Sequence, residues 1–266
     1  MLADYHLHTH NSEDSNVSMA EYVKRALMLG FRDICFTDHV EYAMISPIAK
    51  GEKDYYGEYK QVLAEYGDKL NIKFGAEFGV QKDNIDFFND FFTKYPFDFV
   101  LLSCHTIDGL GLFDGGYLVG KTQKEYNEAY YNEILNVVKN FKNYSVLAHL
   151  DLIRRYDSAY YGFEKTKDIV AEILTQTIND GKGIEVNTSC FRYHIPDLTP
   201  SVDILKLYKD LGGEIITIGS DAHAVNQFGY EIADVREQLA ELGFEHFYTF
   251  DKMQPTKHSM RVIQNV

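Results

Sequence analysis

The feature that most constrains this chain is a regular alternation of short apolar runs with longer amphipathic stretches. Strand-like and helix-like segments alternate about seven times, and a possible eighth strand ends the series. The apolar runs are nearly continuous, which is typical of parallel strands that are covered on both faces. The pattern therefore predicts an α/β fold made of repeated βαβ units.

The boundaries follow from the apolar runs, from two capping boxes that begin at Ser18 and Thr122, and from glycines at helix ends. Strands are expected at 2–7, 33–39, 71–79, 97–106, 144–151, 183–189, 214–223 and 246–250. Helices are expected at 18–30, 58–69, 84–95, 122–141, 165–180, 201–211 and 230–242, and a glycine-rich loop at 107–121.

The length of 266 residues suits one large domain, since α/β barrels often reach about 250 residues as a single unit. An open sheet that binds a dinucleotide would carry a G-x-G-x-x-G turn before a helix, and the chain has none. We therefore expect one closed or nearly closed (β/α) barrel over residues 1–266.

The charge limits the partners of this chain. Forty acidic residues against 26 basic ones leave a net charge of −14, which disfavours nucleic acid and anionic membranes as partners. No apolar run approaches the roughly 20 residues that span a bilayer, and the N-terminus lacks the pattern of a signal peptide. Three cysteines without C-x-x-C spacing predict neither disulfides nor a thiolate zinc site. We expect a soluble cytoplasmic protein and leave its oligomeric state open.

Imidazoles and carboxylates gather at the C-terminal ends of the expected strands. In a barrel, this is the face at which active sites are built. His6-Leu-His8 and Asp221-Ala-His223 each place two side chains on the same side of a strand, since side chains alternate with period two. Six of the ten histidines lie at these ends, together with Asp14, Asp38, Glu77, Asp151 and Asp221.

Such a set of side chains predicts bound cations, because unpaired buried carboxylates are costly. Histidine and carboxylate ligands without thiolate suit Zn²⁺, Mn²⁺ or Fe²⁺. Nine candidate ligands are too many for one ion, so two or three divalent ions are expected. The candidates are His6, His8, Asp14, His39, Glu77, His105, His149, Asp221 and His223.

Six motifs in a fixed order also carry a family resemblance. They are His6-Leu-His8-Thr-His10, Thr37-Asp38-His39, Gly75-Ala-Glu77, Ser103-Cys-His105, Ala148-His149-Leu-Asp151 and Ser220-Asp221-Ala-His223. Together they resemble the polymerase and histidinol phosphatase (PHP) family, and within it the histidinol-phosphate phosphatases. The resemblance covers nearly the whole chain. It implies a distorted (β/α)7 TIM-like barrel with up to three metal ions at the C-terminal ends of the strands.

The resemblance also implies how the ligands are shared. One ion would be held by His6, His8, Glu77 and Asp221, and Glu77 would bridge to a second ion held by His105 and His149. Asp14, His39 and His223 would hold a third ion. Many family members have histidine at the position of Asp14, so this site departs from the family pattern and favours a harder ion.

The implied reaction is hydrolysis of a phosphate monoester. A hydroxide that bridges two ions would attack phosphorus, with Glu77 as the shared ligand, while the cations neutralise the developing charge. Asp38 or Asp151 would either protonate the leaving alkoxide or orient a ligand histidine. Both readings of these two aspartates remain open.

Basic and polar residues on the same rim are candidates for binding the substrate. A guanidinium group fits a phosphate bidentately, which draws attention to Arg192 and to the Arg154-Arg155 pair. Strand-like alternation would turn only one of that pair inward, and we favour Arg154. Tyr117 in the glycine-rich loop is a candidate to cover the site or to hydrogen-bond phosphate, and Asn187 to contact the substrate's amino group or a water.

The expected substrate is therefore a small phosphate monoester. The resemblance implies hydrolysis of L-histidinol phosphate to L-histidinol and phosphate in histidine biosynthesis. One alternative is another PHP phosphoesterase that acts on a nucleotide, an oligonucleotide or a phosphotyrosine protein. Others are a metal-dependent amidohydrolase, which would not need the arginines, and a non-catalytic metal-binding module, which would not need a complete ligand set.

Overall fold

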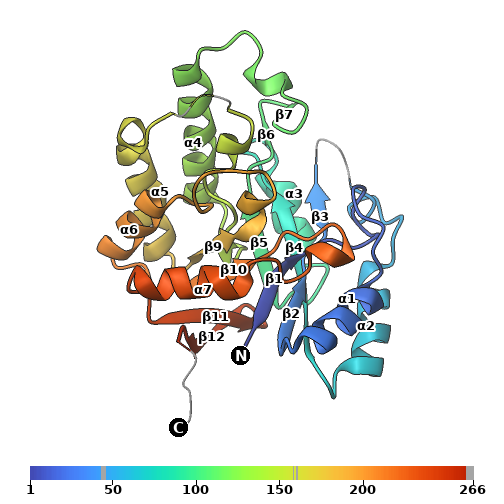
Figure 1. Ribbon diagram of the computed structural model, residues 1–266. Coiled ribbons are helices and arrows are strands. Elements are labelled where there is room, and N and C mark those ends of the chain that lie inside the picture. The colour runs from blue at the N-terminus through green and yellow to red at the C-terminus, as the bar shows by residue number, and fades with distance from the viewer. Residues whose placement is uncertain (43–45, 158, 160, 262–266) are drawn as a thin grey trace.

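A parallel sheet that curls into a nearly closed barrel forms the centre of the molecule (Figure 1). The computed structural model describes residues 1–42, 46–157, 159 and 161–261. In the sheet the order is β1 (Ala3–Leu7), β2 (Asp33–Phe36), β4 (Asn71–Gly79), β5 (Phe99–Ser103), β8 (Val146–Leu147), β9 (Gly183–Asn187) and β10 (Ile216–Gly219). Short β3 (His39–Glu41) extends β2 along β4. The predicted (β/α)7 barrel is confirmed.

The barrel closes between its first and last strands. The amide of His8 donates to the carbonyl of Ala222 (2.9 Å), and the amide of Ala222 donates to the carbonyl of His6 (3.2 Å). Every residue of β1, β2, β5, β9 and β10 is buried, as expected for strands covered by helices. The closure brings residues from the two ends of the chain to the same rim.

Helices cover the outside of the barrel. Figure 1 shows α1 and α2 beside β1 and β2, and α4, α5 and α6 on the opposite side. Each turns one apolar stripe inward, as Met19, Tyr22, Val23 and Ala26 do in α1. Their bounds are α1 (Met19–Leu29), α2 (Tyr55–Tyr66), α3 (Ile85–Phe92), α4 (Gln123–Asn140), α5 (Lys167–Asn179), α6 (Val202–Asp210) and α7 (Ile232–Glu241).

Both predicted capping boxes are present. The Ser18 hydroxyl accepts from the amide of Glu21, whose carboxylate accepts from the amide of Ser18 (2.9 Å). Thr122 and Glu125 make the same pair of bonds at the start of α4. α1 ends at Gly30, whose φ of 76° is a left-handed conformation that glycine adopts without strain.

The expected eighth strand does not belong to the barrel. β11 (His246–Asp251) pairs antiparallel with β12 (Gln254–Ser259), and this hairpin lies below the barrel in Figure 1. The amide of Phe250 donates to the Tyr5 hydroxyl (2.9 Å), and the amide of Met253 donates to the carbonyl of Asp98 (2.8 Å). The hairpin therefore covers the end at which the strands begin, opposite the predicted site.

Several other boundaries differ from the prediction. The strands expected at 144–151 and 214–223 are shorter and end at Leu147 and Gly219. The helix expected at 58–69 begins three residues earlier, at Tyr55, because Asp54 caps it. The glycine-rich loop contains a small hairpin of β6 (Thr106–Ile107) and β7 (Leu110–Gly111). Single 3₁₀ turns occur as η1 (Gly116–Leu118), η2 (Leu152–Arg155), η3 (Phe163–Lys165), η4 (Thr188–Phe191) and η5 (Val225–Gln227).

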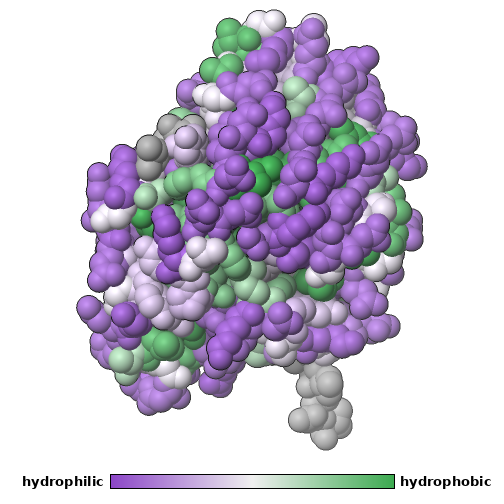
Figure 2. Space-filling view, turned by 180° about the vertical axis from the view of Figure 1, so that it is seen from behind, coloured by the Kyte–Doolittle hydropathy of each residue, from purple (hydrophilic) through white to green (hydrophobic). Residues whose placement is uncertain are grey.

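The surface is mainly polar on the face seen from behind in Figure 2, with small hydrophobic areas between the hydrophilic ones. Among the described residues, no helix combines the length and the apolar character needed to cross a membrane.

Candidate metal centre and active site

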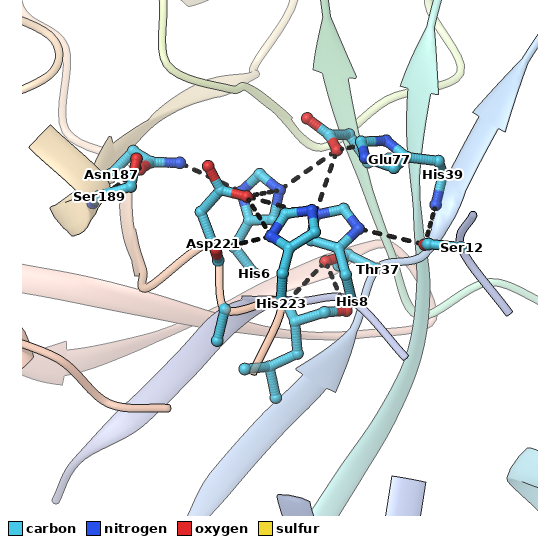
Figure 3. Close-up of polar contacts among 12 residues, drawn as sticks. His6, His8, Ser12, Thr37, His39, Glu77, Asn187, Ser189, Asp221 and His223 are labelled. Carbon is cyan, nitrogen blue, oxygen red and sulfur yellow. Dashed lines mark hydrogen bonds and ion pairs between the residues drawn. The ribbon is translucent and has the colours of Figure 1, made fainter. Parts of the chain in front are cut away.

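The predicted ligands meet at the C-terminal rim of the barrel, and Figure 3 shows His6, His8, His39, Glu77, Asp221 and His223 among them. They arrive from different strands, with His6 on β1, His39 on β3 and Glu77 on β4. The imidazole of His8 lies between two others, with ring centroids 4.2 Å from His39 and 4.1 Å from His223. The barrel thus gathers side chains that are more than 200 positions apart in the chain.

The Glu77 carboxylate is the centre of this cluster. It is fully buried, and each of its oxygens faces a different group of imidazoles. Oε2 lies 2.9 Å from His39 Nδ1, 3.3 Å from His6 Nε2 and 3.4 Å from His8 Nε2. Oε1 lies 2.9 Å from His149 Nε2 and 3.2 Å from His105 Nε2. Glu77 therefore joins two halves of the cluster, one on each oxygen.

Asp221 belongs to the same half of the cluster as His6 and His8. Its Oδ1 lies 3.4 Å from His8 Nε2 and 3.7 Å from His6 Nε2. Contrary to the prediction, Asp221 and His223 do not alternate along a strand, because β10 ends at Gly219 and Asp221 has a left-handed backbone with φ of 54°. The turn, and not strand geometry, directs these two side chains towards the site.

Asp14 lies at the outer edge of the cluster. Its Oδ2 is 3.0 Å from His223 Nε2 and 3.5 Å from His39 Nε2. The side chain of Asp14 is about half exposed, whereas those of His39 and His223 are about four-fifths and three-quarters buried. The three residues expected to form a third metal site therefore lie together, on the most solvent-accessible side of the ligand cluster.

The arrangement passes a test of fit for cations. Within the described part of the chain, four buried atoms have no hydrogen-bond partner although they face one another: His6 Nε2, His8 Nε2, His39 Nδ1 and Glu77 Oε2. Buried polar atoms without partners cost free energy, whereas the same atoms around a Zn²⁺ ion, at about 2.0–2.2 Å, act as ligands. Three groups of ligand atoms are close enough to hold an ion: His8-His39-His223, His6-His8-Glu77 and His39-Glu77-His105.

Two of the ligands, Glu77 and His8, have pKa shifts that suit metal binding. Burial alone would raise the pKa of Glu77, but the facing histidines, first His105 and then His6, hold that pKa well below its usual range. Burial, with His223 and His39 nearby, lowers the pKa of His8 well below its usual value. An ionised carboxylate and a neutral imidazole are the forms that bind metal ions. The facing carboxylates outweigh burial and raise the pKa values of His6, His39 and His105, and a bound cation would displace the protons of these three imidazoles.

Two buried glutamates beneath the histidines were missed by sequence reasoning. Glu185 Oε1 lies 2.5 Å from His6 Nδ1, and Glu41 Oε1 lies 2.6 Å from His105 Nδ1. For Glu185 the signal was a single charge in the mainly apolar strand GIEVN, whereas the short strand HVE gave no such signal for Glu41. That signal does not by itself say which side chain the carboxylate contacts.

Asp38 serves as an anchor and touches no ligand ring among the described residues. Its Oδ1 accepts from the amide of Thr9 (2.6 Å) and from the hydroxyl of Ser12 (2.7 Å). Because the Ser12 proton is used in that bond, the Ser12 oxygen is left to accept from His8 Nδ1 (3.3 Å). Through Ser12, Asp38 is placed to orient the ligand His8, and which of the two predicted roles it has stays a prediction.

Asp151 hydrogen-bonds to Arg154 and Ser201 and, among the described residues, to no ligand histidine. Its Oδ2 accepts from Arg154 Nη1 (2.8 Å) and from the amide of Ser201 (2.9 Å). Burial raises the pKa of Asp151, an effect that Arg154 opposes. Asp151 Oδ1 is buried without a hydrogen-bond partner among the described residues.

The preference for Arg154 over Arg155 is not supported. Both residues lie in the 3₁₀ turn η2 and not in a strand, so alternation does not apply. Arg155 Nη2 donates to the Ser189 hydroxyl (2.7 Å) and lies 3.4 Å from Asp221 Oδ2, and its guanidinium stacks on the Tyr193 ring at 3.8 Å. Arg155 is therefore the member of the pair that reaches the ligand cluster.

Arg192 lies beside the same ligand. Its Nη1 and Nη2 donate to the carbonyls of Ser220 (2.8 Å) and Asp221 (2.7 Å). These bonds hold the turn that follows β10, where Asp221 has its left-handed backbone. Arg192 thus positions the backbone of a candidate ligand and brings a cation to the rim.

Asn187 and Tyr117 are both engaged in the protein framework. The amide oxygen of Asn187 accepts from the amide of Ser189 (3.0 Å), and its nitrogen donates to Glu185 Oε2 (3.2 Å). Tyr117 is buried, and its hydroxyl donates to the carbonyl of Tyr126 (3.0 Å). That either side chain contacts the substrate stays a prediction.

A cavity of about 330 Å³ adjoins the arginines. Its lining combines acidic, basic and aromatic side chains, among them Tyr131, Asp151, Arg154, Arg155, Asp157 and Tyr193. Since Arg155 and Tyr193 form one wall and Arg155 also reaches Asp221, the cavity lies next to the ligand cluster.

Comparison with known proteins agrees with the motifs. The family model described as the PHP domain matches residues 4–189. The chain belongs to the PHP family. A histidinol-phosphatase from Lactococcus lactis is 32% identical over 97% of this chain and 98% of its own length. A probable histidinol-phosphatase from Thermotoga maritima is 29% identical over 92% and 94% of the two chains.

A solved structure of this PHP-family fold gives a similar result. The crystal structure of the Lactococcus lactis histidinol phosphate phosphatase, in complex with zinc, L-histidinol and phosphate, matches with a TM-score of 0.85. The match covers 96% of this chain and 98% of that one. The fold and the family are therefore shared over nearly the full length of both proteins.

Proposed function

We propose that residues 1–266 form a single PHP barrel domain that hydrolyses L-histidinol phosphate to L-histidinol and phosphate in histidine biosynthesis. The observation that carries the proposal is the buried Glu77 carboxylate, faced by imidazoles on both oxygens, with Arg155 and Arg192 beside the same cluster. The similarity to histidinol-phosphatases over nearly the whole chain supports the choice of substrate.

Two or three divalent ions, of Zn²⁺, Mn²⁺ or Fe²⁺, are the proposed cofactors. The Oε2 side of Glu77, with His6, His8 and Asp221, would hold one ion, and the Oε1 side, with His105 and His149, another. Asp14, His39 and His223 would hold a third. When bound, such ions lower the pKa of water and neutralise negative charge on phosphate oxygens.

The side chains of the protein would bind the phosphate and position the ligands. Arg155 presents a guanidinium beside Asp221, where it would bind the phosphate and stabilise the charge that builds up on it. Arg192 would hold the turn that carries Asp221 in place. Stacking on Tyr193 limits the conformations of Arg155, so less entropy is lost on binding.

The cavity beside Arg155 would receive the organic part of the substrate. Histidinol carries an amine and an imidazole, both of which become cationic. Asp157 lines the cavity and would favour such cations, and the Tyr131 and Tyr193 rings offer faces for an imidazole. A nucleotide or a phosphotyrosine peptide would bring no matching positive charge to this cavity.

A panel of phosphate monoesters tests the proposal. The protein loaded with Zn²⁺, Mn²⁺ or Fe²⁺ would be assayed for phosphate release from histidinol phosphate, sugar phosphates, nucleotides and a phosphotyrosine peptide. We expect kcat/KM for histidinol phosphate to exceed the others by at least roughly 100-fold, as a site built around polar groups discriminates. Equal values across the panel would defeat the assignment, and a preference for nucleotides or phosphotyrosine would replace it.

A further inference from the structure

We propose that Glu185 and Glu41 are positioning residues of the metal centre, each holding a ligand histidine from beneath, and that Glu185 acts on both halves of the cluster. The inference rests on the metal site of the proposed function and does not depend on the substrate. It concerns two carboxylates that lie outside the predicted ligand set and face the ligands' far sides.

Glu185 determines which nitrogen of His6 faces the cluster. Both residues are fully buried, and Glu185 Oε1 is 2.5 Å from His6 Nδ1. An ionised carboxylate can only accept, so Nδ1 of His6 carries a proton, and in the neutral imidazole that binds a metal the lone pair would be on Nε2. That lone pair points to Glu77 Oε2, 3.3 Å away. Metal-bound histidines commonly have a carboxylate partner of this kind.

The other oxygen of Glu185 holds His149, in the second half of the cluster. Glu185 Oε2 accepts from the amide of His149 (3.0 Å), and His149 has a positive φ of 25°. A residue other than glycine keeps such a backbone conformation only when its surroundings enforce it. One carboxylate therefore supports His6 on the Oε2 side of Glu77 and His149 on the Oε1 side.

A glycine makes room for the contact between Glu185 and His6. Glu185 is on β9 and His6 on β1, and β10 runs between them. A Cβ atom on Gly219 of β10 would lie 2.4 Å from Glu185 Oε1 and 2.4 Å from His6 Cβ. The φ of Gly219 is not in the left-handed region, so space and not backbone conformation requires glycine here.

Glu41 repeats this arrangement on the other side of the site. It is on β3, its partner His105 follows β5, and β4 runs between them. A Cβ atom on Gly79 of β4 would lie 2.0 Å from Glu41 Oε2. In both places a carboxylate crosses a glycine of the intervening strand to reach a histidine. Glu41, however, contacts one ligand histidine, whereas Glu185 contacts two.

Metal titration tests the inference without any substrate. Metal-free protein would be titrated with Zn²⁺ against a chromophoric chelator, which reports the number of ions and the affinity of each. Losing a partner of this kind typically weakens metal binding about 10–100-fold. We expect Glu41→Gln to weaken one ion and Glu185→Gln to weaken two, because Glu185 supports both halves of the cluster.

Two further variants separate position from charge. Gly219→Ala and Gly79→Ala leave every carboxylate in the chain but push Glu185 and Glu41 away from their histidines. We expect each to reproduce the titration of the corresponding glutamine variant. If metal-free Gly219→Ala loses its far-ultraviolet circular dichroism, Glu185→Gln, which changes almost no volume, decides the question.

The matched control is Glu133→Gln on α4. Glu133 is nearly as buried as Glu185, but it accepts from the amide of Lys82 (2.7 Å) and, among the described residues, makes no hydrogen bond to a candidate ligand. We expect it to bind metal like the wild type. In the zinc-loaded protein, the strongly downfield proton resonance of His6 Nδ1 should move upfield in Glu185→Gln, because a neutral amide accepts more weakly than a carboxylate, and should stay in place in Glu133→Gln.

Wild-type zinc affinity for every ion in Glu185→Gln would overturn the inference, as would equal weakening in Glu133→Gln. Such a result with histidinol-phosphate hydrolysis intact would leave the proposed function standing. Conversely, weakened zinc binding in a protein that does not prefer histidinol phosphate would refute the proposed function alone.

Discussion

Arg154 and Arg155 are adjacent in the chain, yet their guanidinium groups serve different parts of the molecule. Arg154 neutralises the buried Asp151 carboxylate at 2.8 Å. Arg155 stacks on Tyr193 and approaches Asp221 at the edge of the ligand cluster. The difference arises because a 3₁₀ turn spaces consecutive side chains by about 120°, where a strand would turn them to opposite faces.

We therefore expect Arg155→Ala to lower kcat/KM for phosphate monoesters by roughly 10²–10³, the usual cost of removing one donor to a developing negative charge. Bound metal should stay at the wild-type level, measured by elemental analysis. Arg154→Ala is the comparison. It should mainly lower stability, by about 3–5 kcal/mol, because it leaves Asp151 buried without its partner. A larger loss of kcat/KM in correctly folded Arg154→Ala would show that the two roles are reversed.

A second single-residue effect concerns Asp33, at the far end of the barrel from the metal centre. Burial raises the pKa of Asp33 to about 7, and the Tyr5 hydroxyl, which donates to Asp33 Oδ1 (2.8 Å), opposes this. Since the pKa is about 3.9 in an unfolded chain, the folded state holds the proton more tightly. The stability gained from protonated Asp33 is complete below about pH 4 and is lost as the pH rises through about 7.

Asp33→Asn should remove this dependence, because asparagine keeps an acceptor for Tyr5 and carries no charge. Compared by urea unfolding at equal metal content, the variant should match the wild type near pH 4 and exceed it above pH 7, by at most roughly 4 kcal/mol. The comparison cancels the other titrating groups, which both proteins share. A difference in the free energy of unfolding that does not change with pH would rule out Asp33 as the titrating group.

At the scale of elements, the sequence predicted what depends on local patterns. The run 71–79 became β4 with the same bounds, and the capping boxes begin α1 and α4. The run 246–250 is a strand, but its partner is β12 and not the barrel. Apolar character shows that a strand is buried without showing which strand it joins, so the sequence left the partner of this strand open.

In the candidate site, too, the sequence predicted the direct ligands but not the carboxylates behind them. The direct ligands follow strand ends, so a pattern along the chain shows them. The contacts of Glu185 with His6 and of Glu41 with His105 cross an intervening strand at a glycine. Glu185 and His6 are 179 positions apart in the chain, and Glu41 and His105 are 64 positions apart. No local pattern encodes which distant side chain a buried carboxylate will meet, and only the closed barrel reveals it.

The capping box of α1 allows a test at this scale. Ser18→Ala removes the acceptor for the amide of Glu21, and loss of such a cap typically costs about 1 kcal/mol. We expect chemical denaturation to show that decrease in the free energy of unfolding, with metal content unchanged. Ser18→Thr, which keeps the hydroxyl, is the control and should stay within about 0.5 kcal/mol of the wild type. Equal losses in both variants would mean that the cap hydrogen bond is not responsible.

For the whole molecule, the net charge of −14 and an anionic substrate become compatible once the cations are considered. Two or three divalent ions bring about +4 to +6 to the rim, so the local charge would oppose that of the surface. The acidic remainder of the molecule would repel polyanions, while the pocket would admit one small phosphate ester. The ions would thereby set both the chemistry and the selection by charge.

The same ions should also stabilise the barrel as a whole. The candidate ligands come from β1, β3, β4 and from the segments after β5, β8 and β10, so bound ions would tie together most of its circumference. Ligands that bind only the folded state add about 2.7 kcal/mol per site when free ion is at 100 times Kd. In a protein of this size that corresponds to roughly 5–10 °C in Tm for each site.

We therefore expect a chelator to lower Tm by at least that amount and added Zn²⁺ to restore it, as followed by circular dichroism. The control is Glu77→Gln, which removes the negative charge shared by the two halves of the cluster. Its Tm should respond much less to the chelator, because fewer ions would be bound at the start. If Glu77→Gln shows the full wild-type response, the stabilising ions bind elsewhere. If the wild type shows no response, the ligands are held in place by the barrel and its buried carboxylates alone.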